Sequence, residues 1–176
     1  MIKNQGLVIL PPNLEKPVGA LIFLAGPIKG SEKWQEEAIS YLQKLAPEIN
    51  IASPRKRLDR EVIFTEEDYI SQIDWETVYL QRAAEKGAII FWFAKEAIHY
   101  CDRPFARTTS IEFGEWMAHH EHLGSKIVVG FEKGYKGDRY IRQRLKSCPD
   151  IPIRETLQET LDEAIALIAE INPKFL

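Results

Sequence analysis

The sequence predicts an α/β protein whose parallel sheet is covered by helices on both faces. The first observation is that short apolar runs, such as those at 21–25 and 87–93, alternate with stretches of helical periodicity. The second is that the run at 87–93 is apolar throughout, which is typical of a parallel strand buried on both faces. Together they indicate βαβ units in a three-layer sandwich.

Each element has its own signal along the chain. The strand at 21–25 stops at Gly26-Pro27, and Ser31 is the expected N-cap of a helix with apolar positions from Trp34 to Leu45. The further elements expected are a strand at 49–52, a helix at 69–84, a strand at 87–93, a helix at 110–123, a strand at 126–131, a helix at 135–145, a short strand at 151–153 and an amphipathic helix at 156–171.

Five such strands indicate a flavodoxin-like or Rossmann-like sheet. The expected order, with strands numbered along the chain, is 2-1-3-4-5. Residues 1–17 are interpreted as an N-terminal arm in which 7–10 is a candidate edge strand, and residues 18–176 as one domain. A chain of 176 residues is long enough for one sizeable core.

Composition excludes several classes of function. The net charge is −3, which argues against generic binding to nucleic acid or an anionic membrane. No apolar run approaches the roughly 20 residues of a membrane span, and the N-terminus does not resemble a signal peptide. The two cysteines, Cys101 and Cys148, form no CxxC motif. These features favour a cytoplasmic protein.

The most informative stretch is 108–116, Thr-Thr-Ser-Ile-Glu-Phe-Gly-Glu-Trp, which follows the strand at 87–93. Thr109 or Ser110 is the expected N-cap of the next helix, which would place Glu112 in its first turn. That turn would lie near the carboxyl end of a central strand, where open α/β sheets bind ligands. Glu112 is therefore either an acid that stabilises a helix N-terminus or a nucleophile for a sugar carbon.

Glycosidic chemistry needs a second carboxyl group, which protonates the leaving group. Asp74, on the helix expected at 69–84, is one candidate, although it can equally be an exposed helical acid. Asp102, in the loop before Glu112, is another, although it can simply pair with Arg103 or Arg107.

The turn at 26–30, Gly-Pro-Ile-Lys-Gly, matches neither GxGxxG nor a P-loop. Its backbone can still approach a sugar or a phosphate. Basic residues that follow the expected strands would favour an anionic ligand, unless they are solvated loop charges. They are Lys29, Arg55, Arg57, Arg103 and Arg107. His119, His120 and His122 do not form an HExxH motif, and no metal site is expected.

Three segments in order resemble the nucleoside 2-deoxyribosyltransferase superfamily, and specifically its nucleoside 2-deoxyribosyltransferase-like subgroup. They are Ile-Phe-Leu-Ala-Gly-Pro-Ile at 22–28, Gln-Ile-Asp-Trp-Glu at 72–76 and Thr-Ser-Ile-Glu-Phe-Gly at 109–114. The Pro-Arg-Lys segment at 54–56 also resembles that subgroup, and the likeness covers roughly residues 20–131.

The resemblance implies a role for each matching residue. Glu112 would attack C1′ of a 2′-deoxyribonucleoside, Asp74 would contact or protonate the base, and Asp102 matches a second aspartate less well. Phe23 stands where transferases carry a tyrosine. The expected substrate-binding residues are Phe23, Gly26, Pro27, Ile28, Lys29, Arg55, Arg57, Thr109 and Ser110.

The resemblance therefore implies an enzyme that forms a deoxyribosyl ester on Glu112 and transfers the sugar to another base. Two alternatives stay open. The Ile28-Lys29-Gly30 element is shared with nucleotide N-hydrolases, which cleave deoxynucleoside monophosphates with water, and Phe23 favours a non-catalytic nucleotide-binding module. The expected partner is a nucleoside or nucleotide, with no cofactor, and a homodimer or larger homo-oligomer is implied.

Overall fold

The computed structural model describes residues 5–56 and 65–171, and its centre is a six-stranded parallel sheet in the order β1-β3-β2-β4-β5-β6. The strands are β1 (Val8–Ile9), β2 (Leu21–Ala25), β3 (Asn50–Ala52), β4 (Ala88–Phe93), β5 (Ile127–Phe131) and β6 (Ile153–Arg154). The predicted α/β class and parallel sheet are confirmed. The expected order also holds, with β1 added outside β3.

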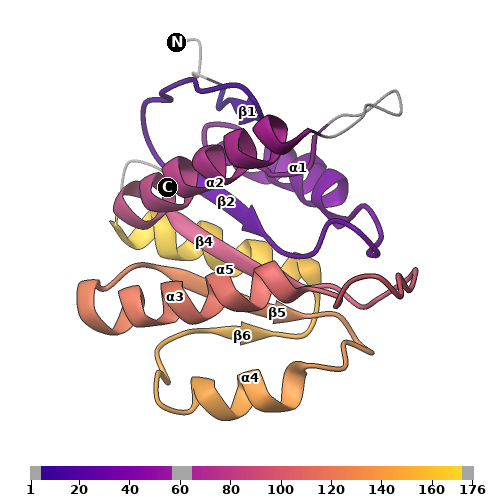
Figure 1. Ribbon diagram of the computed structural model, residues 1–176. Coiled ribbons are helices and arrows are strands. Elements are labelled where there is room, and N and C mark those ends of the chain that lie inside the picture. The colour runs from indigo at the N-terminus through magenta and orange to yellow at the C-terminus, as the bar shows by residue number, and fades with distance from the viewer. Residues whose placement is uncertain (1–4, 57–64, 172–176) are drawn as a thin grey trace.

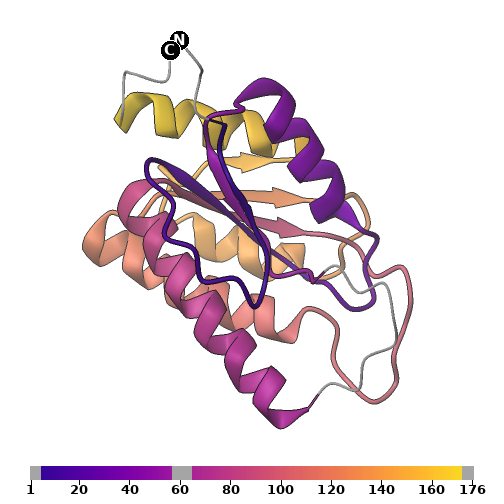
Figure 2. The same cartoon turned by 90° about the horizontal axis from the view of Figure 1, so that it is seen from above.

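Helices cover both faces of this sheet (Figures 1 and 2). They are α1 (Trp34–Leu45), α2 (Glu66–Lys86), α3 (Arg107–Leu123), α4 (Asp138–Leu145) and α5 (Leu157–Ile171). Figure 2 shows α1 and α5 on one side of the strands and α2, α3 and α4 on the other. This is the three-layer arrangement that the alternating pattern predicts.

Strand alternation divides the core into two halves. Phe23 and Phe91 point toward α2 and α3, whereas Ile22 and Leu24 point toward α1 and α5, because successive side chains of a strand face opposite sides of the sheet. All five positions of β2 and all six of β4 are buried. The central strands therefore have no exposed side chains along their length, and ligands can approach only at their ends.

The N-terminal arm joins this core through both backbone and side chains. Val8 pairs with Ile51 of β3, so β1 forms the outer edge of the sheet. Further along the arm, the carbonyl of Asn13 accepts a hydrogen bond from Trp75 Nε1 at 2.6 Å, and the carbonyl of Glu15 accepts one from Tyr79 Oη at 2.5 Å. The sixth strand thus comes from the segment expected to supply an edge strand.

Two expected helix caps are wrong. Helix α1 begins at Trp34 with Lys33 as N-cap, and the Ser31 hydroxyl instead donates to the carbonyl of Pro27 at 2.7 Å. Helix α3 begins at Arg107, after Ala106 in the left-handed conformation (φ 54°), and has no side-chain cap. Ser110 donates its hydroxyl back to the carbonyl of Ala106 at 2.9 Å. Glu112 consequently lies in the second turn of α3 instead of the first.

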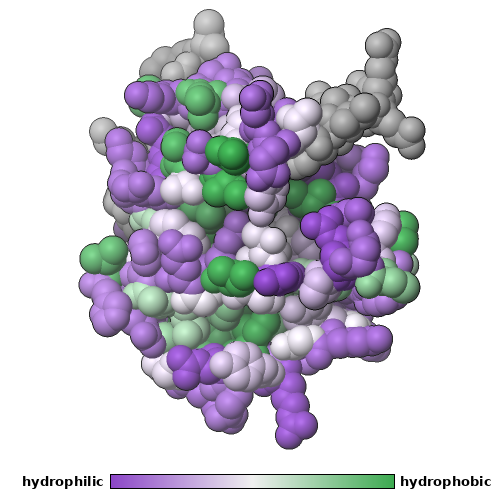
Figure 3. Space-filling view, in the orientation of Figure 1, coloured by the Kyte–Doolittle hydropathy of each residue, from purple (hydrophilic) through white to green (hydrophobic). Residues whose placement is uncertain are grey.

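The outer face of α2 carries several exposed apolar side chains. They are Tyr69, Ile70, Ile73 and Val78, each at least 43% exposed. The space-filling view shows hydrophobic side chains interspersed with hydrophilic ones on the face of the molecule that it presents (Figure 3). Among the described residues, no helix is both long and apolar enough to cross a bilayer.

Candidate active site

The candidate site lies at the carboxyl edge of the sheet, where the 26–30 turn leaves β2. A Cβ atom at Gly26 would lie 2.4 Å from the carbonyl oxygen of Trp92, and Gly30 has a φ of +87°. Only glycine satisfies both conditions without a shift of neighbouring backbone. The carbonyl of Pro27 accepts hydrogen bonds from Trp34 Nε1 at 3.0 Å and from the Ser31 hydroxyl.

Arg55, directly after β3, holds this turn in place. Its Nε donates to Gln35 Oε1 at 2.9 Å, and one of its terminal nitrogens donates to the carbonyl of Ile28 at 3.0 Å. Gln35 is fully buried and donates in turn to the carbonyl of Pro27 at 3.4 Å. Burial lowers the pKa of Arg55. The guanidinium group of Arg55 therefore donates to protein carbonyl groups. This indicates that Arg55 holds the turn in place and does not primarily contact a ligand.

Two glutamates meet across the gap between α2 and α3. The carboxyl of Glu112 hydrogen-bonds that of Glu76, and both side chains are half-buried. Two carboxylates in contact repel each other, so such a pair favours a state in which one proton is held between them. Glu76 and Glu112 are called the carboxyl pair below.

The electrostatics of the pair follow from its surroundings. The pKa of Glu112 is raised from its ordinary value of 4.5 to about 8, first by burial and then by the negative charges of Glu76 and Glu115. Burial also raises the pKa of Glu76, but hydrogen bonds from Gln72 and Glu112 and the charge of Lys56 oppose that rise. At neutral pH the pair is therefore one carboxyl and one carboxylate that share a proton.

This arrangement predicts that Glu112→Gln stabilises the fold at neutral pH. The unfolded side chain ionises above its ordinary pKa of 4.5, whereas the folded one stays protonated up to about 8. Folding stability is therefore lost as the pH rises between those values, and glutamine, which does not ionise, avoids the loss. We expect a gain of about 1–3 kcal/mol at pH 7 and none at pH 4.

Thermal unfolding of the wild type and of Glu112→Gln at both pH values measures this difference. Glu115→Gln, at an exposed position about one turn further along α3, is the comparison variant. It should give a smaller gain at pH 7 than Glu112→Gln, because the charge of Glu115 is only one contribution to the raised pKa of Glu112. A gain from Glu112→Gln that is equal at pH 4 and pH 7 would contradict the raised pKa.

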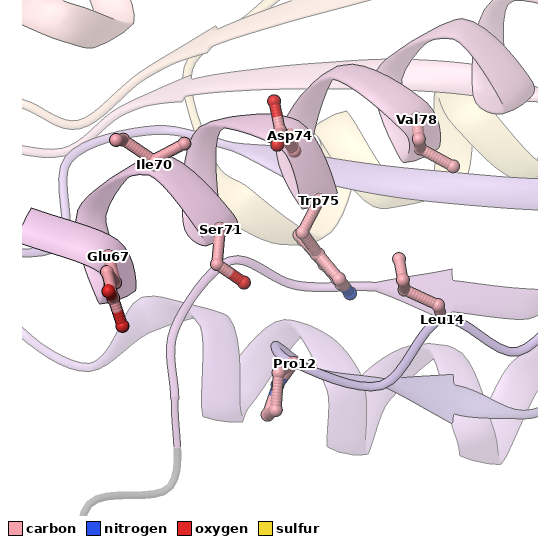
Figure 4. Close-up of a pocket in the computed structure, with 8 residues that line it drawn as sticks. All are labelled: Pro12, Leu14, Glu67, Ile70, Ser71, Asp74, Trp75 and Val78. Atoms are coloured by element: carbon pink, nitrogen blue, oxygen red, sulfur yellow. The ribbon is translucent and has the colours of Figure 1, made fainter.

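Asp74, the acid expected to act with Glu112, does not face it. Positions 74 and 76 are about 200° apart around a helix, and Asp74 is exposed. Figure 4 shows Trp75 pointing from α2 toward Leu14 of the arm, while Asp74 points away from Trp75. A surface pocket lies here, lined by Pro12, Leu14, Glu67, Ile70, Ser71, Asp74, Trp75 and Val78. This pocket does not include either member of the carboxyl pair.

The other expected residues are distributed unevenly around the site. Phe23 is 1% exposed, with its ring centroid 6.0 Å from that of Trp75, so it is a core residue. Thr109 is also buried, whereas Asp102 and Ser110 are exposed. Lys29 is exposed and places its Nζ 4.5 Å from the centre of the Tyr100 ring. Arg57 lies outside the described residues.

Sequence reasoning missed Glu76, although it lies in the segment that the resemblance singled out. Helical spacing places Glu76 on the same face as Gln72, and the buried Trp75 and Tyr79 mark the face toward the sheet. That pattern leaves two flanks, one with Asp74 and one with Glu76. Only the packing of α3 beside α2 decides which flank faces Glu112.

Fold and site together define an α/β protein with a half-buried pair of carboxyl groups between α2 and α3. Among the described residues, no group of three or more His, Cys, Asp or Glu side chains is arranged to hold a metal ion. A model of the family described as "Nucleoside 2-deoxyribosyltransferase like" matches residues 19–135. The chain belongs to this family. No curated protein matches it.

Proposed function

We propose that this protein cleaves the N-glycosidic bond of 2′-deoxyribonucleosides through a covalent intermediate on Glu112 and transfers the sugar to another base. The observation that carries the proposal is the carboxyl pair, which supplies a nucleophile and a proton donor in one contact. The family supports a deoxyribosyl substrate. Glu76 takes the acid role that the sequence assigned to Asp74.

The reaction balances with one proton on the pair. The proton of Glu112 passes along the hydrogen bond to Glu76, which leaves Glu112 as a carboxylate. As the C1′–N bond breaks, Glu76 protonates the departing base and a Glu112 oxygen bonds C1′. A second base, or water, then attacks C1′ and gives its proton to Glu76, and Glu112 leaves as the carboxylate. The two inversions give overall retention.

Hydrolysis of deoxynucleoside 5′-monophosphates is the second candidate, and the 26–30 turn favours it. The turn's carbonyls accept from protein donors: Pro27 from Trp34, Ile28 from Arg55, and Gly30 from the N–H groups of Ala97 and Ile98. Among the described residues, no acceptor takes the N–H groups of Ile28 and Lys29. Free backbone N–H groups beside an exposed lysine are suited to a phosphate.

A substrate panel distinguishes the two reactions. Deoxynucleosides and their 5′-monophosphates are incubated with and without an acceptor base, and chromatography measures the free base and the exchanged nucleoside. Transfer predicts exchange that depends on the acceptor. Hydrolysis predicts base release that needs no acceptor base and that favours monophosphates over nucleosides by about ten- to a hundredfold, the worth of a charge-assisted phosphate contact.

High salt should weaken a preference for monophosphates, because the screening length falls with ionic strength. Equal turnover of nucleoside and monophosphate at low and high salt would contradict a phosphate-binding site. The transferase hypothesis would then be favoured over the hydrolase hypothesis. Absence of both exchange and release would leave the non-catalytic nucleotide-binding module. The homo-oligomer implied by the family resemblance remains a prediction.

A further inference from the structure

Gln72 links the carboxyl pair to the segment after β3. Its Nε2 donates to Glu76 Oε1 at 2.9 Å and to the carbonyl of Pro54 at 3.0 Å. A side-chain amide nitrogen carries two hydrogens, so both are used, and the half-buried side chain is held at two points. Gln72 therefore fixes where the carboxyl of Glu76 lies relative to the strand end.

The chemistry of this contact is one-sided. The amide nitrogen of Gln72 can only donate, and a hydrogen bond to a carboxylate is stronger than one to a neutral acid. Lys56, on the segment after β3, adds a positive charge near Glu76, whereas the negative charges of Glu76 and Glu115 act on Glu112. The influences on the pKa of Glu112 are burial and the two glutamates, whereas Glu76 receives a hydrogen bond from the Gln72 amide.

We propose that Gln72 is a positioning residue of this site: it holds Glu76 as the carboxylate of the pair and so leaves the shared proton on Glu112. The proposal rests on the proposed function, because it assigns the resting state of the same pair. With the proton on Glu112, Glu76 is the base that withdraws it when the substrate arrives. The pair then enters the reaction from a single protonation state instead of a mixture of two.

The same helix offers a matched control. Gln81 Nε2 donates to Glu85 Oε1 at 3.2 Å, which repeats the four-residue spacing of Gln72 and Glu76 at an exposed position. Gln72→Met removes the donor at similar size, Gln72→Glu replaces it with an isosteric acceptor, and Gln81→Met removes a comparable donor away from the site.

Carboxyl-carbon NMR titration of the glutamates, assigned with Glu76→Gln and Glu112→Gln, tests the proposal without relying on activity. The shared proton of the carboxyl pair is lost in the titration step at higher pH. In the wild type and in Gln81→Met, this step should change the chemical shift of the Glu112 carboxyl carbon alone. In Gln72→Met and Gln72→Glu, that step should be shared between the signals of Glu76 and Glu112. A high-pH step that stays on Glu112 alone in both Gln72 variants overturns the proposal.

Kinetics give a second readout. Gln72→Met should slow base release by about ten- to a hundredfold, the worth of a hydrogen bond to a charged group, and should alter the high-pH limb of the rate profile. Gln81→Met should leave both unchanged. A Gln72→Met profile identical in shape to that of the wild type also overturns the proposal. If the wild type releases no base at all, the proposed function fails, and the titration still decides the role of Gln72.

Discussion

Glu112→Ala and Glu112→Gln should reduce base release from deoxynucleosides by at least about a thousandfold, the largest effect expected of any substitution in this chain. Without the carboxylate no ester with C1′ can form, and the proton that passes to Glu76 is also lost. The fold should persist, because Glu112 belongs to the paired acids at the sheet edge and not to either apolar core cluster.

Mass spectrometry of the wild type during turnover should show the deoxyribosyl adduct on the peptide that contains Glu112, and neither variant should form it. Glu115→Gln is the control on the same helix and should keep activity within a few-fold of the wild type. Base release by Glu112→Ala within tenfold of the wild-type rate would remove Glu112 from the mechanism.

Glu76→Gln should reduce the release of poorly leaving bases by about a hundred- to ten-thousandfold, as expected for loss of a general acid. Leaving groups that depart without protonation should be affected much less, because Glu112 can still attack C1′. The negative charge of Glu76 helps to raise the pKa of Glu112 from 4.5 to about 8. In the variant, the fall in activity as the pH rises through that region should disappear.

Asp74→Asn is the matched control for Glu76→Gln, since Asp74 lies on the same helix two positions earlier with its side chain exposed. We expect little change in rate for any leaving group. If Asp74→Asn instead slows the release of poorly leaving bases selectively and Glu76→Gln does not, Asp74 is the general acid and the carboxyl pair has a structural role.

The fold could be predicted almost completely, because its signals are local. Continuous apolar runs at 21–25 and 87–93 can be buried only as central parallel strands, and the alternation with helices then restricts the topology to few orders. The caps were less predictable. Serine is a common N-cap residue, but the hydroxyls of Ser31 and Ser110 donate hydrogen bonds to nearby backbone carbonyls and cap no helix.

The partners of the basic residues were also less predictable than their positions. Arg55 was expected to face an anionic ligand, and its position after β3 is as expected. Its guanidinium group, however, donates to the carbonyl of Ile28 and to the buried Gln35. An arginine near a strand end can bind a ligand, or it can hydrogen-bond the loop around the ligand. Which of the two it does depends on whether carbonyl groups of the loop lie within reach and lack another donor.

By itself, the sequence determined the α/β class, the strand order, the family and the position of Glu112 beside a central strand, because each depends on residue type and spacing along the chain. The tertiary structure alone decided which acid meets Glu112. Asp74 and Glu76 are both helical acids flanking the buried Trp75, and no periodicity distinguishes them. The placement of α3 against one flank of α2 brings Glu76 into contact, and burial of that contact shifts the pKa of both carboxyl groups.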